Sequence, residues 1–281
     1  MENMDLRASS PGMIRRLGRL FDERTGCSVI VAMDHGIGGV PDGFRYPQQL
    51  LETILGARPD GVLLNAGLAR RVAHLFSRRD APALVLGIDQ LIHSGPRGKG
   101  PAERHWAQFP VEEAVRLGAD AVKAMLLMGS PDPAVRAENL SYLTHTAAAC
   151  RQWEIPLMIE PYLWGTEVPS DPAERAQMNA DGARIAIELG ADILKLEYGG
   201  DPDRFREIVE ASPVPVFILG GPKRPTERET IADVVSGAQA GAVGLTIGRN
   251  IWQHSNPARV VRALRTALAT KNLDAAMAEL A

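Results

Sequence analysis

Two lysines stand inside apolar segments of the chain, where lysine is seldom found. Lys123 lies in AVKAMLL (121–127) and Lys195 lies in DILKLEY (192–198). Lysine is among the residues least often buried, so each ammonium group needs a carboxylate partner, a path to solvent or a chemical role. A desolvated lysine amine can attack a carbonyl group and form an imine. We therefore predict imine chemistry, with Lys195 as the attacking residue.

The presence of two such lysines suggests how one of them could lose its proton. A free lysine has a pKa of about 10.4 and is almost fully protonated at neutral pH, whereas imine formation needs the neutral amine. A neighbouring ammonium group and partial desolvation both disfavour the charged form, and a pKa lowered by about 3 units corresponds to roughly 4 kcal/mol. The sequence therefore predicts that Lys123 lies beside Lys195 and lowers its pKa.

Three further polar residues, at the ends of apolar segments, could move protons. Cleavage of an aldol requires that one proton leave a hydroxyl group and that another arrive at the carbon left behind. The candidates are Asp34, Glu160 and Tyr162. Each also has a structural interpretation: Asp34 could cap the loop at 35–43, Glu160 could pair with a lysine, and Tyr162 could merely pack. We favour catalytic roles for the two carboxylates and leave the role of the tyrosine open.

Two glycine-containing segments near the C-terminal end could bind a phosphate group. FILGGPK (217–223) and TIGRN (246–250) each follow an apolar segment. Glycines let backbone N–H groups approach phosphate oxygens, a helix start adds a favourable dipole, and an arginine adds a bidentate contact. The predicted contacts are Gly220, Gly221, Gly248 and Arg249. The glycines could instead serve only as turn residues, and the arginine could lie on the surface.

The histidines and cysteines give no sign of a metal centre. The six histidines show neither HExxH nor another metal-ligand spacing, and two cysteines cannot build a Cys-based zinc site. We therefore predict no metal and no other cofactor. His35, which directly follows Asp34, is the histidine that we expect near the substrate or its phosphate, although it could simply hydrogen-bond its own loop.

Eight short segments rich in Val, Ile and Leu must position these residues. Each is bounded by Gly, Pro or Asp and alternates with a longer helical pattern, which is typical of βα units. The segments are 28–34, 61–67, 83–89, 121–127, 156–162, 192–198, 215–221 and 242–248. Because they are almost continuously apolar, both faces of each strand should be buried, as in a parallel sheet covered by helices.

This pattern predicts an α/β protein with a single (β/α)8 TIM barrel, a fold of about 250 residues. In such a barrel the C-terminal ends of the strands build the active site, and alternate strands share an interior layer. Lys123 and Lys195 should therefore point into the same space. An open doubly wound sheet is the alternative fold, but the first predicted strand is not followed by the G-x-G-x-x-G phosphate fingerprint.

The composition favours a small-molecule partner over nucleic acid or a membrane. The 281 residues carry a net charge of −3, and the scattered Lys and Arg form no basic stripe. The first residues lack the apolar stretch of a signal peptide, and no run approaches the length of a membrane span. With Cys27 and Cys150 as the only cysteines, a reducing cytoplasm is the expected compartment. We expect one domain over 1–281, with an N-terminal extension (1–26), a barrel core (27–255) and C-terminal helices (256–281).

Several of these motifs together resemble class I (Schiff-base) aldolases. MDHG (33–36), ADILKLE (191–197), GGPK (220–223) and GRNIWQ (248–253) are similar to the archaeal-type fructose-bisphosphate aldolases and the 2-amino-3,7-dideoxyheptulosonate synthases, whereas ADAVKAML (119–126) and MIEPY (158–162) look like tagatose-bisphosphate aldolases. The resemblance spans about residues 27 to 255. It implies a TIM barrel that forms a homo-oligomer.

The resemblance also implies individual roles. Lys195 falls on the Schiff-base lysine, Asp34 on the acidic residue of the first strand, and Lys123 and Glu160 on the lysine and glutamate of the tagatose type. Tyr162 falls on the proton-donating tyrosine of the archaeal type. The phosphate-binding positions of the family fall on Gly220, Gly221, Gly248 and Arg249.

Two segments depart from the family pattern or extend it. Where the synthases tend to show Tyr-Pro-Arg-Gly, this chain has Tyr-Leu-Trp-Gly at 162–165, which removes a polar group. The segment 90–109 is expected to be an extended loop on the catalytic side, serving as a lid or an oligomer contact.

The predicted function is that of a metal-independent aldolase which reversibly cleaves a phosphorylated ketose and releases dihydroxyacetone phosphate or an analogue. One alternative is a transaldolase-type synthase that passes the same enamine to a second carbonyl compound. From other classes, the chain could be a non-catalytic sugar-phosphate-binding barrel, or an epimerase or decarboxylase that needs no covalent lysine.

Overall fold

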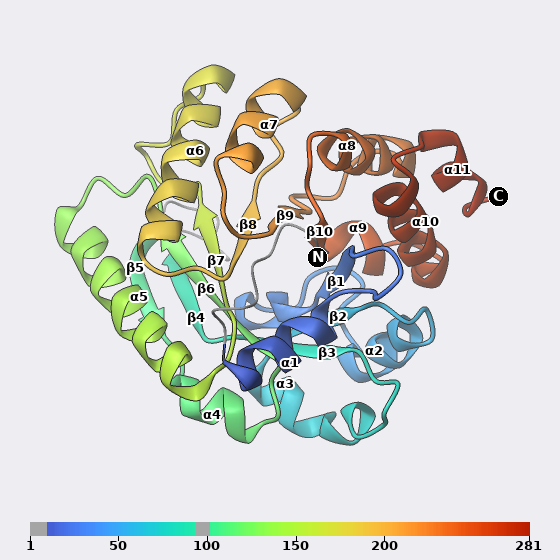
Figure 1. The fold of residues 1–281 in the computed structure, drawn as a ribbon, viewed down its shortest axis with the longest axis horizontal. Coiled ribbons are helices and arrows are strands. Elements are labelled where there is room, and N and C mark those ends of the chain that lie inside the picture. The colour runs from blue at the N-terminus through green and yellow to red at the C-terminus, as the bar shows by residue number, and fades with distance from the viewer. Residues whose placement is uncertain (1–9, 94–101) are drawn as a thin grey trace.

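Eight parallel strands form a closed barrel in the computed structural model, which describes residues 10–93 and 102–281 (Figure 1). In the order in which they pair around the barrel, the strands are β1 (Ser28–Ala32), β10 (Gly244–Ile247), β9 (Val216–Leu219), β8 (Ile193–Leu196), β7 (Leu157–Tyr162), β6 (Ala121–Leu127), β3 (Ala83–Gly87) and β2 (Gly61–Asn65). Each coincides with one of the eight apolar segments. The predicted (β/α)8 barrel is therefore confirmed, with strands somewhat shorter than their segments.

Helices surround this barrel. They are α1 (Pro11–Leu20), α2 (Pro47–Leu55), α3 (Ala66–Arg71), α4 (Val111–Arg116), α5 (Pro133–Trp153), α6 (Pro172–Glu188), α7 (Pro202–Glu210), α8 (Glu227–Gln239), α9 (Arg249–Trp252), α10 (Pro257–Thr270) and α11 (Leu273–Ala278). Several begin with proline at the first helical position, where a missing N–H costs nothing, and Asp132, Asp171 and Asp201 cap three of these starts. Within the described ranges, no helix is long and apolar enough to cross a membrane.

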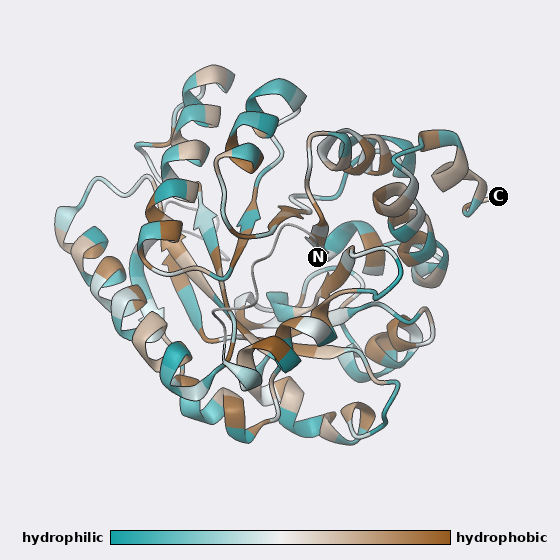
Figure 2. Cartoon of the chain, in the orientation of Figure 1, coloured by the Kyte–Doolittle hydropathy of each residue, from teal (hydrophilic) through white to brown (hydrophobic). Residues whose placement is uncertain are grey.

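Apolar side chains fill two layers. One lies between the strands and the helices outside them, and in Figure 2 the strands are mainly hydrophobic while the helices alternate between hydrophobic and hydrophilic residues. The other fills the N-terminal end of the barrel interior, where α1 closes the bottom: Leu17, Leu20 and Phe21 pack with Ile30 and Phe217. The rings of Phe21 and Phe217 meet edge to face at 5.6 Å.

Buried carboxylates complete the hydrogen bonds at the bottom of three strands. Each carboxylate belongs to the residue directly before one strand and accepts a hydrogen bond from a backbone N–H of a neighbouring strand. The pairs are Val29 N to Asp60 at 2.8 Å, Leu84 N to Asp120 at 2.9 Å, and Leu157 N to Asp192 at 2.9 Å. Asp120 and Asp192 belong to the repeated LGAD phrase, so this repeat is explained by strand alignment.

The segment predicted as an extended loop contains a second, small sheet. Strands β4 (Asp89–His93) and β5 (Ala102–Ala107) form an antiparallel hairpin between β3 and α4. Residues 90–93 and 102–107 of the predicted extended loop are therefore strands, and its role as a lid or an oligomer contact stays a prediction. Residues 94–101, at its centre, and residues 1–9 of the predicted N-terminal extension lie outside the described residues.

Candidate active site

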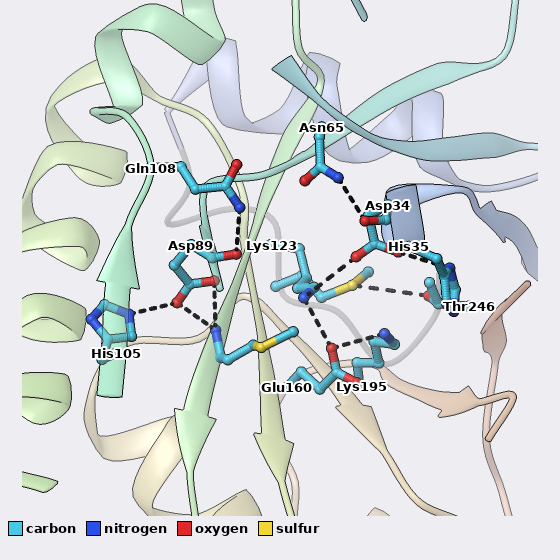
Figure 3. Close-up of polar contacts among 12 residues, drawn as sticks. Asp34, His35, Asn65, Asp89, His105, Gln108, Lys123, Glu160, Lys195 and Thr246 are labelled. Atoms are coloured by element: carbon cyan, nitrogen blue, oxygen red, sulfur yellow. Dashed lines mark hydrogen bonds and ion pairs between the residues drawn. The ribbon is translucent and has the colours of Figure 1, made fainter. Parts of the chain in front are cut away.

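The two lysines predicted to share a layer do meet inside the barrel, with Glu160 between them (Figure 3). They extend from β6 and β8, the two neighbours of β7, from which Glu160 extends. One carboxylate oxygen, Glu160 Oε2, lies 2.8 Å from Lys195 Nζ and 3.2 Å from Lys123 Nζ. The Lys195 and Lys123 side chains are only 8% and 1% exposed. The chain thus forms a lysine–carboxylate–lysine bridge in a nearly dry environment.

Asp34 completes this cluster from the opposite side of the barrel. Its Oδ2 atom lies 3.6 Å from Lys123 Nζ. The residue was expected to end the first strand, but β1 ends at Ala32 and Asp34 begins a short 3-10 helix that runs to Gly38. The Asn65 amide, at the end of β2, donates to the Asp34 carbonyl at 2.6 Å and so fixes this turn.

Charge compensation keeps this cluster ionised. Burial alone would lower the pKa of Lys123, but the carboxylates of Glu160, Asp34 and Asp89 outweigh burial and raise it. Burial would raise the pKa of Glu160, but Lys195 and Lys123 hold it below its usual range. The pKa of Asp34 is lowered in the same way, against burial, chiefly by Lys123. Lys123, Glu160 and Asp34 are therefore held in their charged forms.

Lys123 and Lys195 do not lie side by side as predicted, because Glu160 separates them. The sequence suggested two adjacent cations, whereas the structure places a shared carboxylate between them. The alternative interpretation, that Glu160 pairs with a lysine, is what the structure shows, and such a pair also suits proton transfer because its Oε2 is within hydrogen-bond distance of Lys195 Nζ. That Lys123 favours the neutral form of Lys195 stays a prediction.

Tyr162 ends β7 on the same face as Glu160, because residues two apart on a strand point the same way. Its ring stacks on that of Trp164, with centroids 6.0 Å apart and planes 16° apart. Burial and the negative charge of Glu160 raise the pKa of Tyr162 to about 12. The phenol is therefore protonated at neutral pH and can donate a proton.

The predicted phosphate loops lie side by side. Gly220 and Gly221 directly follow β9, and Gly248 directly follows β10. A Cβ atom on Gly220 would collide with the Ile247 side chain, and one on Gly248 with the carbonyl oxygen of Ala32, so close packing of the strands requires glycine at both positions. Glycine is thus explained structurally at both positions, whether or not a phosphate binds.

Asn250, which sequence reasoning missed, ties these two loops together. Its Nδ2 atom donates to the carbonyl oxygens of Gly220 at 2.9 Å and Pro222 at 3.1 Å, and its Oδ1 accepts the Arg224 N–H at 2.8 Å. The GRN motif contained the residue, but nothing in its spacing indicated a contact about thirty positions away.

Arg249 and His35 lie beside this pair of loops. Arg249 Nε is buried and has no hydrogen-bond partner in the part of the chain that the structure describes. Burial lowers the pKa of His35, with the charge of Arg249 adding to the effect and Asp34 opposing it. The imidazole Nδ1 lies 3.5 Å from Asp34 Oδ1, and its ring meets Trp252 edge to face. His35 is therefore held in its neutral form beside Asp34.

Two buried residues outside the predicted set also belong to the surroundings of Lys123. Asp89 and His105, at the base of the β4–β5 hairpin, form a pair with Nε2 and Oδ2 3.0 Å apart. Neither was identified from the sequence. His105 lies in the segment that was expected to be an extended loop, whereas Asp89 ends the apolar segment 83–89 and could have been found by the signal that singled out Asp34. Among residues 10–93 and 102–281, no group of three or more His, Cys, Asp or Glu side chains could hold a metal ion.

Comparisons with known proteins identify the family. Residues 28–254 match the model of the DeoC/LacD family aldolases. The chain is 34% identical over 255 residues to the class 1 fructose-bisphosphate aldolase of Thermoproteus tenax, covering 88% of this chain and 90% of the relative. It is 31% identical over 248 residues to 2-amino-4,5-dihydroxy-6-oxo-7-(phosphonooxy)heptanoate synthase of Streptomyces griseus, covering 86% of this chain and 85% of the relative.

Solved structures give the same result. An archaeal fructose-1,6-bisphosphate aldolase whose catalytic lysine is covalently bound to the carbinolamine intermediate of its substrate superimposes with a TM-score of 0.76 at 31% identity, covering 92% of this chain and 99% of the other. The fold and these matches define an aldolase, a carbon–carbon lyase. More particularly, the chain belongs to the DeoC/LacD aldolase family.

Proposed function

We propose that this protein is a class I aldolase in which Lys195 forms a Schiff base with a phosphorylated ketose, and that cleavage releases dihydroxyacetone phosphate or a close analogue. The main support for this proposal is the position of Lys195 Nζ, which is buried in the barrel and lies 2.8 Å from Glu160 Oε2. A buried lysine beside a carboxylate has a built-in acceptor for the proton that it must lose.

Imine formation begins with that proton. Glu160 accepts it from Lys195, and the neutral Nζ adds to the C2 carbonyl of the ketose to give a carbinolamine. The carbinolamine hydroxyl then takes up a proton, leaves as water and produces the iminium ion. Lys123 remains charged throughout, so that the shared carboxylate can release and recover a proton without leaving an uncompensated buried charge.

Cleavage then needs a base and an acid. A carboxylate, Asp34 or Glu160, removes the proton of the C4 hydroxyl, the C3–C4 bond breaks, and its electron pair passes to the iminium nitrogen as an enamine. The aldehyde leaves. Tyr162 or Glu160 returns a proton to C3, and water hydrolyses the resulting iminium, which frees Lys195 and the three-carbon phosphate. Both candidates extend from β7, and burial and Glu160, which raise the pKa of Tyr162, keep its phenol protonated before the transfer.

The phosphate group would lie against Gly220, Gly221, Gly248 and Arg249, with His35 beside it. The closeness of the two loops, held by Asn250, supports this placement. The buried Arg249 Nε offers a charged donor, and Gly221, where an added Cβ would meet no atom within 4 Å, offers the close approach that a phosphate needs.

A transaldolase-type synthase is the second candidate. It is favoured by the 31% identity to the heptanoate synthase, which spans most of both chains. In that case the enamine, instead of being protonated, would attack an added carbonyl compound. Product analysis with and without an acceptor aldehyde separates the two reactions.

Sodium borohydride trapping tests the covalent step. The protein is incubated with dihydroxyacetone phosphate, reduced, and analysed by mass spectrometry as an intact chain and as peptides. We expect one adduct, on Lys195, that is lost in Lys195→Met and kept in Lys271→Met, a matched change at an exposed lysine. Absence of an adduct with this and other ketone phosphates, in folded protein, would overturn the proposal in favour of a non-covalent enzyme or a binding barrel.

The remaining expectations from the sequence stay predictions. They are a single domain over 1–281, a homo-oligomer, a cytoplasmic location, activity without a metal or other cofactor, and a phosphorylated sugar rather than nucleic acid or a membrane as the partner.

A further inference from the structure

The ladder between β3 and β6 ends before β6 does. β3 pairs with β6 only as far as Gly87 and Lys123, and Ile88 N donates to the Lys123 carbonyl at 3.1 Å. The chain then leaves the barrel to form the hairpin. On its other edge β6 stays paired with β7 as far as Leu127 and Tyr162. The edge of β6 beyond Lys123 must therefore find hydrogen bonds elsewhere.

Two buried side chains supply these hydrogen bonds. Asn139, from α5, accepts the Leu127 N–H at 2.9 Å and donates to the Met125 carbonyl at 2.9 Å. Asp89 accepts the Met125 N–H through both oxygens, at 2.9 and 3.2 Å. Asn139 shows that a neutral amide suffices to complete a strand edge, whereas burying a carboxylate for the same purpose is costly. The charge at position 89 therefore needs a further explanation.

His105 gives this carboxylate a buried side-chain partner, with Nε2 and Asp89 Oδ2 3.0 Å apart. It reaches Asp89 from β5, and the two side chains are 2% and 0% exposed. The ring of Tyr142, on α5, covers the imidazole with centroids 4.3 Å apart. Gln108 holds the base of the hairpin as well, because its side chain donates to the Asp89 carbonyl at 3.1 Å. The hairpin is thus fastened to β6 by a dry, charge-assisted contact (Figure 3).

This contact leads to the candidate proton donor. Leu91, on β4, packs in a small apolar cluster with Met125 and Leu127 of β6, and Tyr162 packs against that cluster. Met125 is also the residue whose N–H is bound by Asp89. The position of the hairpin, the end of β6 and the ring of Tyr162 are therefore set by one continuous group of contacts.

We propose that Asp89 and His105 are a positioning pair, which fastens the β4–β5 hairpin to β6 and thereby holds Tyr162 at the carbon that is protonated. The pair touches no reacting atom. The inference rests on the proposed aldolase reaction and adds to it that the hairpin is a fixed wall of the site. A pair that only completed the strand edge would affect stability alone.

The test separates imine formation from proton transfer. Imine formation is measured as borohydride adduct on Lys195 at saturating dihydroxyacetone phosphate. Proton transfer is measured as exchange of a C3 hydrogen of the same compound with deuterium from solvent, which needs no acceptor aldehyde. The variants are Asp89→Asn, His105→Ala and His105→Gln, which keeps an N–H donor.

Asp120→Asn is the matched control. Asp120 also accepts a strand N–H, that of Leu84 at 2.9 Å, and pairs with a cation, Arg19, but it does so at the opposite end of the barrel. The control should lower the melting temperature and leave both chemical measurements unchanged.

We expect Asp89→Asn and His105→Ala to keep the adduct yield and to lose roughly 10- to 100-fold in the exchange rate, the cost of a displacement of about 1 Å. His105→Gln should restore exchange to within about threefold of the wild type. The inference is overturned if exchange survives in both disruptive variants, or if adduct and exchange fall together. Should the unmodified protein form no adduct, the proposed function itself would fail, and this inference with it.

Discussion

Replacement of Lys123 by Met tests the central electrostatic argument. Both ammonium nitrogens contact the same oxygen, Glu160 Oε2, at 2.8 and 3.2 Å, so they lie at most about 6 Å apart. At an effective dielectric constant of about 20, two unit charges at that separation repel each other by about 3 kcal/mol. Since each 1.4 kcal/mol is a factor of about ten in an equilibrium, removal of this repulsion should lower the rate of imine trapping at neutral pH by up to roughly a hundredfold.

The assay is the pH dependence of borohydride trapping at Lys195 with dihydroxyacetone phosphate. Methionine has nearly the length of lysine without its charge, so Lys123→Met should move the midpoint of the trapping curve to higher pH. Loss of the cation also leaves Glu160 to Lys195 alone, which acts in the same direction. Lys271→Met, at an exposed lysine, should leave the midpoint unchanged. An unchanged midpoint in folded Lys123→Met protein would refute the argument.

Three further predictions concern the other groups of the site. If Tyr162 returns the proton to C3, Tyr162→Phe should keep the Lys195 adduct and lose about 100-fold or more in deuterium exchange, whereas Glu160→Gln should lower the rate of adduct formation itself. Asn250→Ala, which releases the two phosphate loops, should weaken binding of inorganic phosphate, measured calorimetrically, by about tenfold while leaving the far-ultraviolet circular dichroism unchanged. The pKa values of Asp34 and Glu160 are lowered in the folded protein. The stability that these carboxylates contribute should therefore be present at neutral pH and lost as the pH falls through their folded-state pKa values. Urea unfolding of Glu160→Gln should accordingly show a weaker dependence on pH in that acidic range.

The barrel could be predicted because its signals are local. Each of the eight strands is a short, almost continuously apolar run, and a run of that kind indicates a strand buried on both faces. The shared layer of Lys123 and Lys195 followed from the same regularity, since alternate strands face the same interior space. The position of Glu160 between the two lysines could not be predicted. It depends on the register of β7 against β6 and β8, which no spacing in the sequence reveals.

The hairpin could not be predicted in this way. The sequence of β5 is AERHWA, in which charged and aromatic residues replace the aliphatic run that marks the barrel strands. The sequence of β4 is DQLIH, in which three of the five residues are polar. The roles of Asp89 and His105 depend on pairing across this hairpin, between residues 16 positions apart. These roles also depend on the end of the β3–β6 pairing at Lys123, which leaves that edge of β6 without a strand partner.

The two ends of the barrel interior perform different tasks. At the N-terminal end, α1 and the strand starts form an apolar plug, in which Ile30, Leu63 and Phe217 are fully buried. At the other end, the barrel carries a buried cluster of two lysines and two carboxylates. Such a cluster is a poor way to stabilise a fold, because desolvation of charges offsets most of their attraction. In the proposed mechanism such a cluster has a use, because a proton can pass between Lys195 and Glu160 while Lys123 keeps the total charge compensated. Function therefore requires that the apolar end stabilise the barrel enough to tolerate the charged end.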